Sequence, residues 1–314
     1  MAGELRFDPL TREWVSIVGH RQRRPNLPEA GCPFCVGGLE APEPYDVRWF
    51  TNRWPAFSEG DPIDLAAAEA AGTTTLHAAG TTEVILFSPE HHATLGALPV
   101  PHVRKVVDLW AERTVALHER DDVEYVLVFE NRGAEVGATI SHPHGQIYAF
   151  GFVPPVPARE AEVAHEHGCP LCAEVAAELG AGARVVYESD TWIAYVPYAS
   201  AYSYGVRVVA RDHVGGFPAL DGAGRDGLAA ALHDVLGRYD RMWRTEPTDP
   251  PFPYLLWFHQ AAKHDDGAAH LHAHTAPPLR APGVMRFVAS GELGGGTLSN
   301  PVVPEDAAAT LRSA

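Results

Sequence analysis

The order of motifs along the chain repeats once, and this repeat constrains the fold more than any other feature. Each copy begins with a Cys-x-x-Cys pair, CPFC from Cys32 and CPLC from Cys169. Each then reaches an acid-His pair, a long amphipathic segment, a β-rich run and a stretch of alternating histidines. Internal similarity of this kind indicates a duplicated supersecondary unit. We therefore expect two fused α+β halves, each with an antiparallel sheet packed against a long helix.

The elements of each half can be placed from their periodicity. Apolar spacing predicts the long helix of the first half at 101–120 and that of the second at 224–244. A β-rich run follows each helix, over 124–131 and 254–260, and the alternating histidines lie on the next strand. The second half has a further expected strand over 191–198.

A proline-rich segment is expected to link the two halves. GFVPPVPARE, residues 151–160, contains three prolines, which discourage both a helix and a central strand. We place the first half at residues 1–155 and the second at residues 156–314. The glycine-rich tail that begins at Gly291 is expected to be irregular.

Composition limits the classes of partner. The chain of 314 residues, 46% of them hydrophobic, can form a substantial core. It has no run of eighteen apolar residues, so no membrane-spanning helix is expected, and MAGELRFDPLTREW has no apolar signal region, which favours the cytoplasm. A net charge of −16 disfavours broad nucleic-acid binding. The basic patch His20–Pro25 suits a small phosphorylated ligand, or is a solvated loop.

The four cysteines all lie in the two Cys-x-x-Cys motifs. A disulfide framework of a secreted protein is not expected in a chain of this kind. Thioredoxin-like redox pairs are an alternative, but neither motif stands in a clear strand-to-helix unit. Metal binding explains the pairs better, because the seventeen histidines can supply the remaining ligands.

Each half therefore has an expected zinc site of two cysteines and two histidines. The first set is Cys32, Cys35, His91 and His142, and the equivalent second set is Cys169, Cys172, His213 and His272. Protein side chains fill all four positions in each set, which favours structural over catalytic zinc. Two alternatives exist for the second half: a copy that has lost its metal, or a different site of His259, His272 and His274 that holds iron or zinc.

The stretch ISHPHGQIYAF places His142, His144 and Gln146 on one face of a strand. If His142 binds metal, the imidazole of His144 is available as a nucleophile toward phosphorus, which would give a covalent nucleotidyl-histidine. The Gln146 amide can donate to phosphate oxygens. The preceding loop, residues 130–139, contains two glycines and can bring backbone N–H groups close to a phosphate.

The segment NRGAEVGATISHPHGQIYAF resembles the active-site segment of galactose-1-phosphate uridylyltransferases, the transferase branch of the histidine-triad superfamily. The resemblance covers most of the chain, from FDPLTREWVSIVGHRQRRP through CPFC, FTNRWPAF and FSPEHHATL to WFHQA, HLHAH and RFVASGE. It implies a duplicated histidine-triad fold, structural zinc on the first set and a homodimer. It also implies ping-pong exchange of UMP between UDP-glucose and galactose 1-phosphate, as part of galactose metabolism.

The resemblance also implies roles for individual residues. His144 matches the nucleophile that becomes uridylylated, and Gln146 matches the glutamine that holds the phosphate of the intermediate, where hydrolases have a third histidine. Positions that would contact uridine or its phosphates are Phe50, Asn52, Phe129, Asn131 and Thr139. Arg21 and Arg24 would support substrate phosphates across a dimer, and the hexose phosphate would be read by Arg286, Phe287 and Glu292.

Two departures from the family pattern leave the acceptor open. Arg53 stands where some members have an acid near the base, and Gly291 stands where many have a tyrosine near the sugar. One alternative is an ADP-glucose or dinucleotide phosphorylase that uses inorganic phosphate, and another is a transferase for a specialised sugar 1-phosphate. A third, from another class, is a nucleotide-binding or zinc-stabilised interaction protein without turnover. The presence of both His144 and Gln146 disfavours it.

Overall fold

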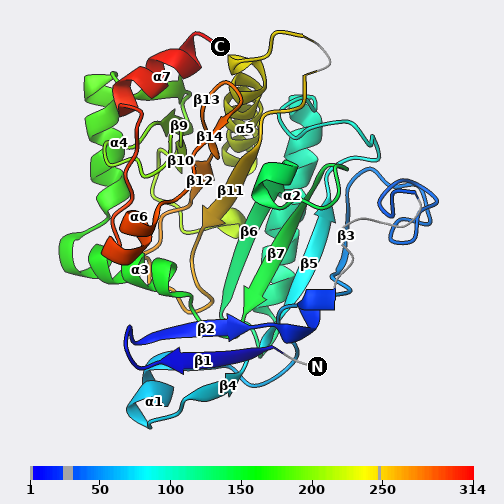
Figure 1. The fold of residues 1–314 in the computed structure, drawn as a ribbon, viewed down its shortest axis with the longest axis vertical. Helices are drawn as coiled ribbons and strands as arrows, with labels where there is room; N and C mark the ends of the chain where they lie inside the picture. Colours follow the sequence, from blue (N-terminus) through cyan, green and yellow to red (C-terminus); the bar gives the residue numbers. More distant parts are fainter. Residues whose placement is uncertain (1–2, 24–30, 247–248) are drawn as a thin grey trace.

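The computed structural model describes residues 3–23, 31–246 and 249–314. Its centre is one antiparallel sheet of nine strands, to which both halves of the chain contribute (Figure 1). In order across the sheet the strands are β3 (Arg48–Thr51), β5 (Gly80–Leu86), β7 (His144–Phe150), β6 (Tyr125–Arg132), β11 (Tyr254–His259), β12 (His272–Ala276), β10 (Arg207–Ala210), β9 (Trp192–Tyr195) and β8 (Val185–Glu188).

Strands β6 and β11 form the seam between the two halves. Tyr254 pairs with Arg132 and Trp257 pairs with Phe129 across this seam. On either side the strand order repeats, because β6 is followed by β7 and β5, and β11 is followed by β12 and β10. The predicted α+β class and the predicted duplication are therefore confirmed.

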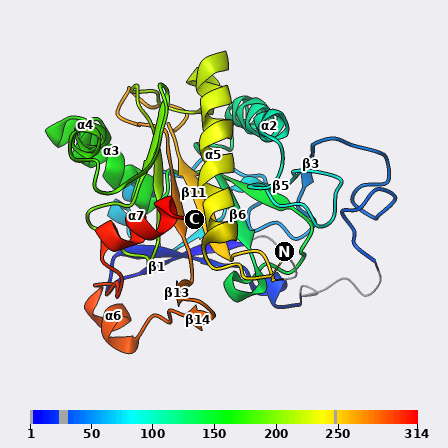
Figure 2. The same cartoon turned by 90° about the horizontal axis from the view of Figure 1, so that it is seen from above.

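Two long helices cover one face of the sheet. They are α2 (Val100–His118) and α5 (Gly222–Met242), which contact each other and stand side by side in Figure 2. The main core lies between these helices and the sheet, where buried side chains such as Trp110 and Leu232 meet Ile147 and Ala149 of β7. Because side chains alternate along a strand, His144, Gln146 and Tyr148 face the other way. Within the described ranges, every helix is too short or too polar to span a lipid bilayer.

The opposite face of the second half carries a pair of helices, α3 (Pro155–His167) and α4 (Pro170–Ala181). Val209 and Ile193 pack toward α4, whereas the alternate residues Val208 and Ala194 belong to the main core on the other face. The prediction that residues 151–160 form a non-helical linker is wrong from Pro155 onward. A proline in the first turn of a helix loses no hydrogen bond, since that N–H would have no intrahelical partner.

Shorter elements complete the fold. A three-stranded sheet in the order β2-β1-β4 lies below the main sheet in Figure 1. The glycine-rich stretch over residues 291–306 is less irregular than predicted, because it contains most of one helix and the start of another. The remaining elements are β1 (Glu4–Asp8), β2 (Glu13–Ile17), η1 (Gly19–Arg23), α1 (Leu65–Ala70), β4 (Thr75–His77), η2 (Ala134–Val136), η3 (Phe217–Ala219), β13 (Leu279–Ala281), β14 (Val284–Met285), α6 (Ser290–Gly295) and α7 (Pro304–Arg312).

Candidate active site and metal clusters

The start of β7 presents His144 to a cavity of about 440 Å³. Its Nδ1 lies 2.8 Å from the backbone carbonyl oxygen of His142. A carbonyl only accepts, so Nδ1 carries the hydrogen and Nε2 carries the lone pair. This local bond between residues two apart fixes both the tautomer and the direction of the ring. The ring edge of Phe34, from the CPFC segment, lies 5.1 Å away between centroids and supports the same orientation.

Gly145 lets β7 pass very close to the Phe87 ring and to the backbone of β6. A Cβ atom there would lie 2.7 Å from the Phe87 ring and 2.9 Å from the Phe129 carbonyl oxygen, so only glycine is accommodated. Gln146 follows on the same face as His144. Its Oε1 is buried and has no hydrogen-bond partner among the described residues, which is a costly arrangement for a group that serves only packing. The amide therefore has unused hydrogen-bonding capacity, although Gln146 is not among the residues that line the cavity of about 440 Å³.

The loop before β7 closes the cavity. Asn131 and Thr139 line it together with His144. Gly133 and Gly137 have φ values of 99° and 81°, and this left-handed backbone lets the loop turn tightly around the cavity. Phe129 pairs with Gln146 across β6 and β7, and the Phe50 ring lies 5.8 Å from that of Phe34.

The other predicted substrate contacts are distributed differently. Arg21 donates a 2.8 Å hydrogen bond to the hydroxyl of Tyr148 on β7, and Asn52 is buried and accepts from the backbone N–H of Trp54 at 2.9 Å. Arg24 lies outside the described residues. In the tail, Arg286 and Glu292 form an ion pair at 2.7 Å and Phe287 is exposed. None of these three described tail residues lines the cavity around His144 in the same chain.

Behind this face, a buried carboxyl group lies on β6 beside Asn131. Burial raises the pKa of Glu130 to about 7, although the Arg132 guanidinium and a 2.9 Å hydrogen bond from the Tyr254 hydroxyl both act to lower it. The folded protein therefore holds this proton more tightly than the unfolded chain does.

This group makes stability depend on pH. Between about pH 4.5 and 7 the folded state binds more protons at Glu130 than the unfolded state, so its contribution to the free energy of unfolding falls as pH rises. Glu130→Gln removes the titration and keeps an acceptor for Tyr254. We expect the free energy of unfolding of the variant, relative to wild type, to rise by up to about 3 kcal/mol between about pH 5 and 8. Urea denaturation at each pH measures this, and a constant difference would contradict it.

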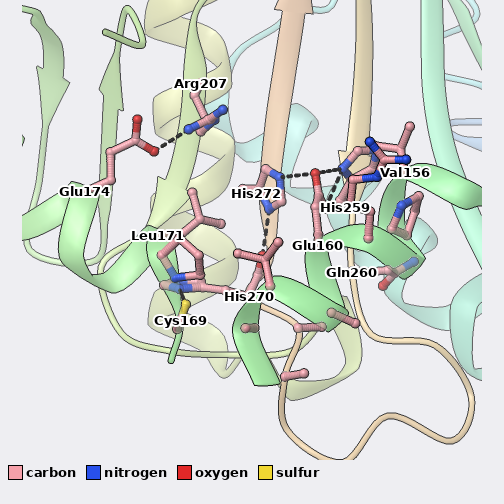
Figure 3. Close-up of a pocket in the computed structure, with 18 of the residues that line it drawn as sticks. Val156, Glu160, Cys169, Leu171, Glu174, Arg207, His259, Gln260, His270 and His272 are labelled. Atoms are coloured by element: carbon pink, nitrogen blue, oxygen red, sulfur yellow. Dashed lines mark hydrogen bonds and ion pairs between the residues drawn. The ribbon is translucent and has the colours of Figure 1, made fainter. Parts of the chain in front are cut away.

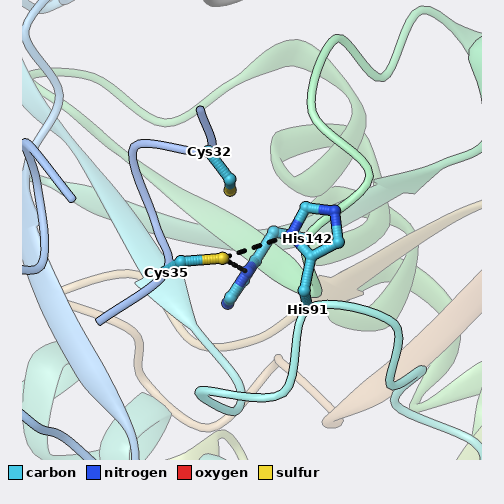
Figure 4. A group of neighbouring side chains, drawn as sticks. All are labelled: Cys32, Cys35, His91 and His142. Carbon is cyan, nitrogen blue, oxygen red and sulfur yellow. Dashed lines mark hydrogen bonds between the residues drawn. The ribbon is translucent and has the colours of Figure 1, made fainter. Parts of the chain in front are cut away.

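The first predicted metal set comes together beside the start of β7 (Figure 4). The Sγ atom of Cys35 lies 3.4 Å from Nδ1 of His91 and 3.7 Å from Nδ1 of His142. A tetrahedral zinc with bonds of about 2.3 Å to sulfur and 2.0 Å to nitrogen separates such ligands by about 3.5 Å. Nε2 of His142 lies 2.8 Å from the Ser88 carbonyl, which leaves the Nδ1 lone pair directed at the thiols. The donors suit a closed zinc site.

The second set also forms, but one predicted ligand is wrong. Nδ1 of His270, not of His272, lies 3.3 Å from Cys169 and 3.6 Å from Cys172, and His213 lies 3.4 Å from Cys172. His270 directs Nε2 to the Ala210 carbonyl at 2.8 Å, as His142 does to Ser88. In the alignment of HPHGQ with HLHAH, His270 occupies the position of His142.

His272 belongs to a third cluster with Glu160, His259 and His274, whose ligand atoms lie within 4.8 Å of one another. The structure thus contains both sites that the sequence suggested as alternatives for the second half. Glu160 was missed because it lies in the segment expected to be a linker. It reaches from α3 to His259 at 2.9 Å (Figure 3). Nε2 of His274 is buried without a described hydrogen-bond partner, as expected for a metal ligand.

The charges in this third cluster suit a borderline cation. Burial acts to raise the pKa of Glu160, but the hydrogen bond from His259 and the nearby imidazole of His272, 3.8 Å away, outweigh it and hold the pKa well below its usual range. Burial holds the pKa of His274 well below its usual range, so this imidazole stays neutral. A carboxylate with three imidazoles is a donor set for zinc or iron(II).

The two halves use equivalent positions differently. Nδ1 of His272 lies 2.7 Å from the His270 carbonyl, which repeats the bond between His144 and His142. His272 therefore corresponds to His144, and His274 corresponds to Gln146. His272 and His274 belong to a metal-competent cluster, and His272 also lines a cavity of about 640 Å³ beside α3. His144 lines the cavity of about 440 Å³ and belongs to no such cluster among the described residues.

Comparison with known proteins gives two family matches that together span nearly the whole chain. Residues 1–154 match the galactose-1-phosphate uridyl transferase N-terminal domain, and residues 159–314 match the C-terminal domain. A galactose-1-phosphate uridylyltransferase of Thermotoga maritima is 36% identical over 318 residues, with 98% of each chain covered.

Solved structures give the same pattern. A uridylyltransferase structure superposes with a TM-score of 0.85 at 29% identity and covers 99% of this chain and 98% of that chain. An ADP-glucose phosphorylase from Arabidopsis thaliana with bound ADP-glucose superposes with a TM-score of 0.73 at 26% identity, covering 100% and 99%. The predicted duplicated histidine-triad-like fold is consistent with both superpositions.

Proposed function

Because the chain belongs to the galactose-1-phosphate uridylyltransferase family, we propose that this transferase exchanges UMP between UDP-glucose and galactose 1-phosphate, or a related sugar 1-phosphate. The exchange proceeds by a ping-pong route through uridylyl-His144. The observation that carries the proposal is the 2.8 Å contact between Nδ1 of His144 and the His142 carbonyl. It makes Nε2 the nucleophilic atom and presents it to the cavity.

In the first step, the Nε2 lone pair attacks the α-phosphorus of UDP-glucose. The bond from that phosphorus to the bridging oxygen breaks, and its electron pair leaves with glucose 1-phosphate. The imidazole ring becomes cationic, and its Nδ1–H continues to donate to the His142 carbonyl, which stabilises the charge. In the second step, a phosphate oxygen of galactose 1-phosphate attacks the same phosphorus, and the bond to Nε2 breaks. No net proton transfer is needed.

The neighbouring groups hold the phosphoryl group during both steps. The Gln146 amide shares the face of His144, and Asn131, Thr139 and the backbone of the glycine loop surround the cavity. These are neutral donors aimed where negative charge develops, and such preorganised donors are a major source of rate acceleration. Zinc in the first cluster would hold the CPFC segment against the start of β7 and takes no part in bond making.

The proposal includes a homodimer. Arg286, Phe287 and Glu292 are the predicted hexose-phosphate contacts, and they do not line the cavity of their own chain. A second copy can supply them to the His144 site. Analytical ultracentrifugation of the purified chain tests this part of the proposal, and a monomer with full activity would remove it.

Gln146→His tests the role of the amide. A glutamine cannot deliver a proton, whereas an imidazole can act as a general acid or base toward water. We expect the ratio of UDP-glucose hydrolysis to transfer to rise by about 10²-fold, the lower end of general acid–base effects. The two rates are measured on the same sample with and without a sugar 1-phosphate.

Gln146→Met is the control, because it fills the space and cannot relay a proton, and its ratio should stay near the wild-type value. A ratio in Gln146→His that also stays there would contradict the proposed role.

A second candidate is the phosphorylase reaction, supported by the likeness to the Arabidopsis ADP-glucose phosphorylase. It keeps the covalent chemistry of His144 and changes the base and the acceptor. Parallel assays with UDP-glucose and ADP-glucose, each discharged by galactose 1-phosphate or by inorganic phosphate, separate the two. A preference of more than tenfold for ADP-glucose and phosphate would favour this second candidate.

A further inference from the structure

The two metal-competent clusters of the second half meet on consecutive outward positions of one segment. His270 belongs to the cysteine cluster and His272 to the carboxylate cluster, and Nδ1 of His272 donates to the His270 carbonyl at 2.7 Å. Their ligands from outside this segment include Glu160 on α3 and two cysteines at the start of α4. The carboxylate cluster therefore links α3 to the sheet, and the cysteine cluster links the start of α4 to a neighbouring position. Figure 3 shows Glu160 beside His259 and His272, and Cys169 beside His270.

The packing of α3 by itself is weak. Every residue from 155 to 167 is described, and none of them is buried. A cavity of about 640 Å³, lined by Val156, Val163 and Leu171 among others, takes the place of a packed core beside α3. Burial of apolar surface is the usual source of helix docking energy, at about 25 cal/mol per Å². α3 therefore lacks what normally holds a surface helix.

The neighbouring helix α4 has its own attachment. Val175 is buried with Ile193, Tyr195 and Val209 in a small apolar cluster. Glu174 accepts a 2.9 Å hydrogen bond from the Tyr195 hydroxyl and pairs with Arg207. Apart from a 3.5 Å contact between the exposed side chains of His165 and Asp266, the described ion pairs from α3 to the sheet are those of Glu160 with His259 and His272, which belong to the third cluster.

We propose that the two clusters bind metal cooperatively and together hold α3 against the sheet. Metal bound by Cys169 and Cys172 fixes the start of α4, and only residues 161–168 separate this point from Glu160. Fixing one end of such a short, largely helical connection raises the effective concentration of the Glu160 carboxylate near its three histidines. The coupling is reciprocal, so metal at the carboxylate cluster also favours metal at the cysteine cluster.

The chemistry assigns a cation class to each cluster. Two thiolates with two imidazoles select zinc, and a carboxylate with three imidazoles accepts zinc or iron(II). The first cluster, with Cys32 and His91, lies in the other half and shares no ligand or helix with these two. It should fill independently, which makes it a matched control. The inference does not depend on the proposed transfer reaction.

The test uses the full-length chain, stripped of metal and reloaded with zinc or cobalt(II). Glu160→Gln removes the carboxylate ligand, His213→Ala removes one ligand of the cysteine cluster, and His91→Ala is the control in the first half. Glu160 is 40% exposed and His213 is also exposed, so neither substitution opens the core. The thiolate-to-cobalt absorption band reports filling of the cysteine clusters, and hydrogen exchange of peptides over 155–167 reports docking of α3.

We expect Glu160→Gln to weaken cobalt binding at the cysteine cluster of the second half by roughly 5- to 150-fold, the usual range for coupled sites. Both Glu160→Gln and His213→Ala should speed exchange in α3 at least about tenfold, and His91→Ala should not change it. Wild-type protein treated with a chelator should show the same fast exchange in α3. An unchanged cobalt titration in Glu160→Gln, or unchanged α3 exchange in His213→Ala, would overturn the proposal. Uridylylation of His144 is read by neither assay.

Discussion

The His144→Asn variant is expected to lose UMP exchange by about 10⁴- to 10⁶-fold, the scale observed when a catalytic nucleophile is removed. The asparagine amide nitrogen lies near the former Nδ1 and can still donate to the His142 carbonyl, but no atom replaces Nε2. His144 is not part of any metal-competent cluster among the described residues, so the metal content and the unfolding temperature should match those of wild type. Steady-state exchange assays, elemental analysis and thermal denaturation together measure the effect.

A variant of the equivalent residue in the second half provides the matched control. His272 has the same local geometry as His144 but belongs to the third cluster. His272→Asn should therefore lose the metal of the third cluster and, through the proposed coupling, bind metal more weakly at the cysteine cluster of the second half, while it keeps the ability to form a nucleotidyl intermediate. If His144→Asn retained more than about 1% of wild-type exchange, another nucleophile or a direct transfer would have to replace the covalent route.

Cys32→Ser is expected to lower the free energy of unfolding by on the order of 4 kcal/mol, because loss of a metal ligand is among the most damaging single changes. The remaining ligands Cys35, His91 and His142 come from three separate segments, which a shared metal would join in addition to the hydroxyl of Tyr45, 2.7 Å from the Phe34 carbonyl and 2.9 Å from Nε2 of His142. The CPFC segment also positions Phe34 against the His144 ring, so exchange should fall as well. Denaturation curves and metal content measure the change.

Ala41→Ser is the control for Cys32→Ser, because Ala41 is buried in the same small apolar cluster and is not a metal ligand. It should cost about 1 kcal/mol or less and leave the metal in place. A Cys32→Ser protein with wild-type metal content and stability would show that the first cluster is not a structural metal site.

Much of the fold can be predicted from this sequence because its periodicities are clear. The helix expected at 101–120 is observed at Val100–His118, and the one expected at 224–244 is observed at Gly222–Met242. The pairing of β6 with β11, in contrast, is not predicted by any sequence pattern. Both strands are buried for much of their length, and no local pattern states which edge of one half meets the other.

The errors at the metal clusters have a physical cause. In HLHAH, three histidines alternate, and spacing alone allows either His270 or His272 to join the cysteines. The structure uses both, because each lies on the outward face and each finds a different set of partners. Glu160 was missed since prolines at 154, 155 and 157 indicate a linker, yet Pro155 begins a helix that carries Glu160 to the sheet.

The tail around Gly291 bears on the choice of acceptor. Gly291 begins the turn of α6, and a Cβ atom there would meet nothing within 4 Å. This open space stands where the resemblance places an aromatic side chain near the sugar. In the proposed dimer we expect the acceptor preference to depend on the exposed tail around Phe287, which does not line the cavity at His144 of its own chain.

The central claim is that His144 forms a covalent nucleotidyl intermediate. The most direct measurement is the intact mass of the wild-type chain after incubation with UDP-glucose alone, with His144→Asn and ADP-glucose in parallel. We predict that the wild-type chain gains the mass of one UMP, which peptide mapping locates to His144 and a sugar 1-phosphate discharges. The His144→Asn variant should show no such gain. No adduct with UDP-glucose, or an adduct that persists in His144→Asn, would contradict it.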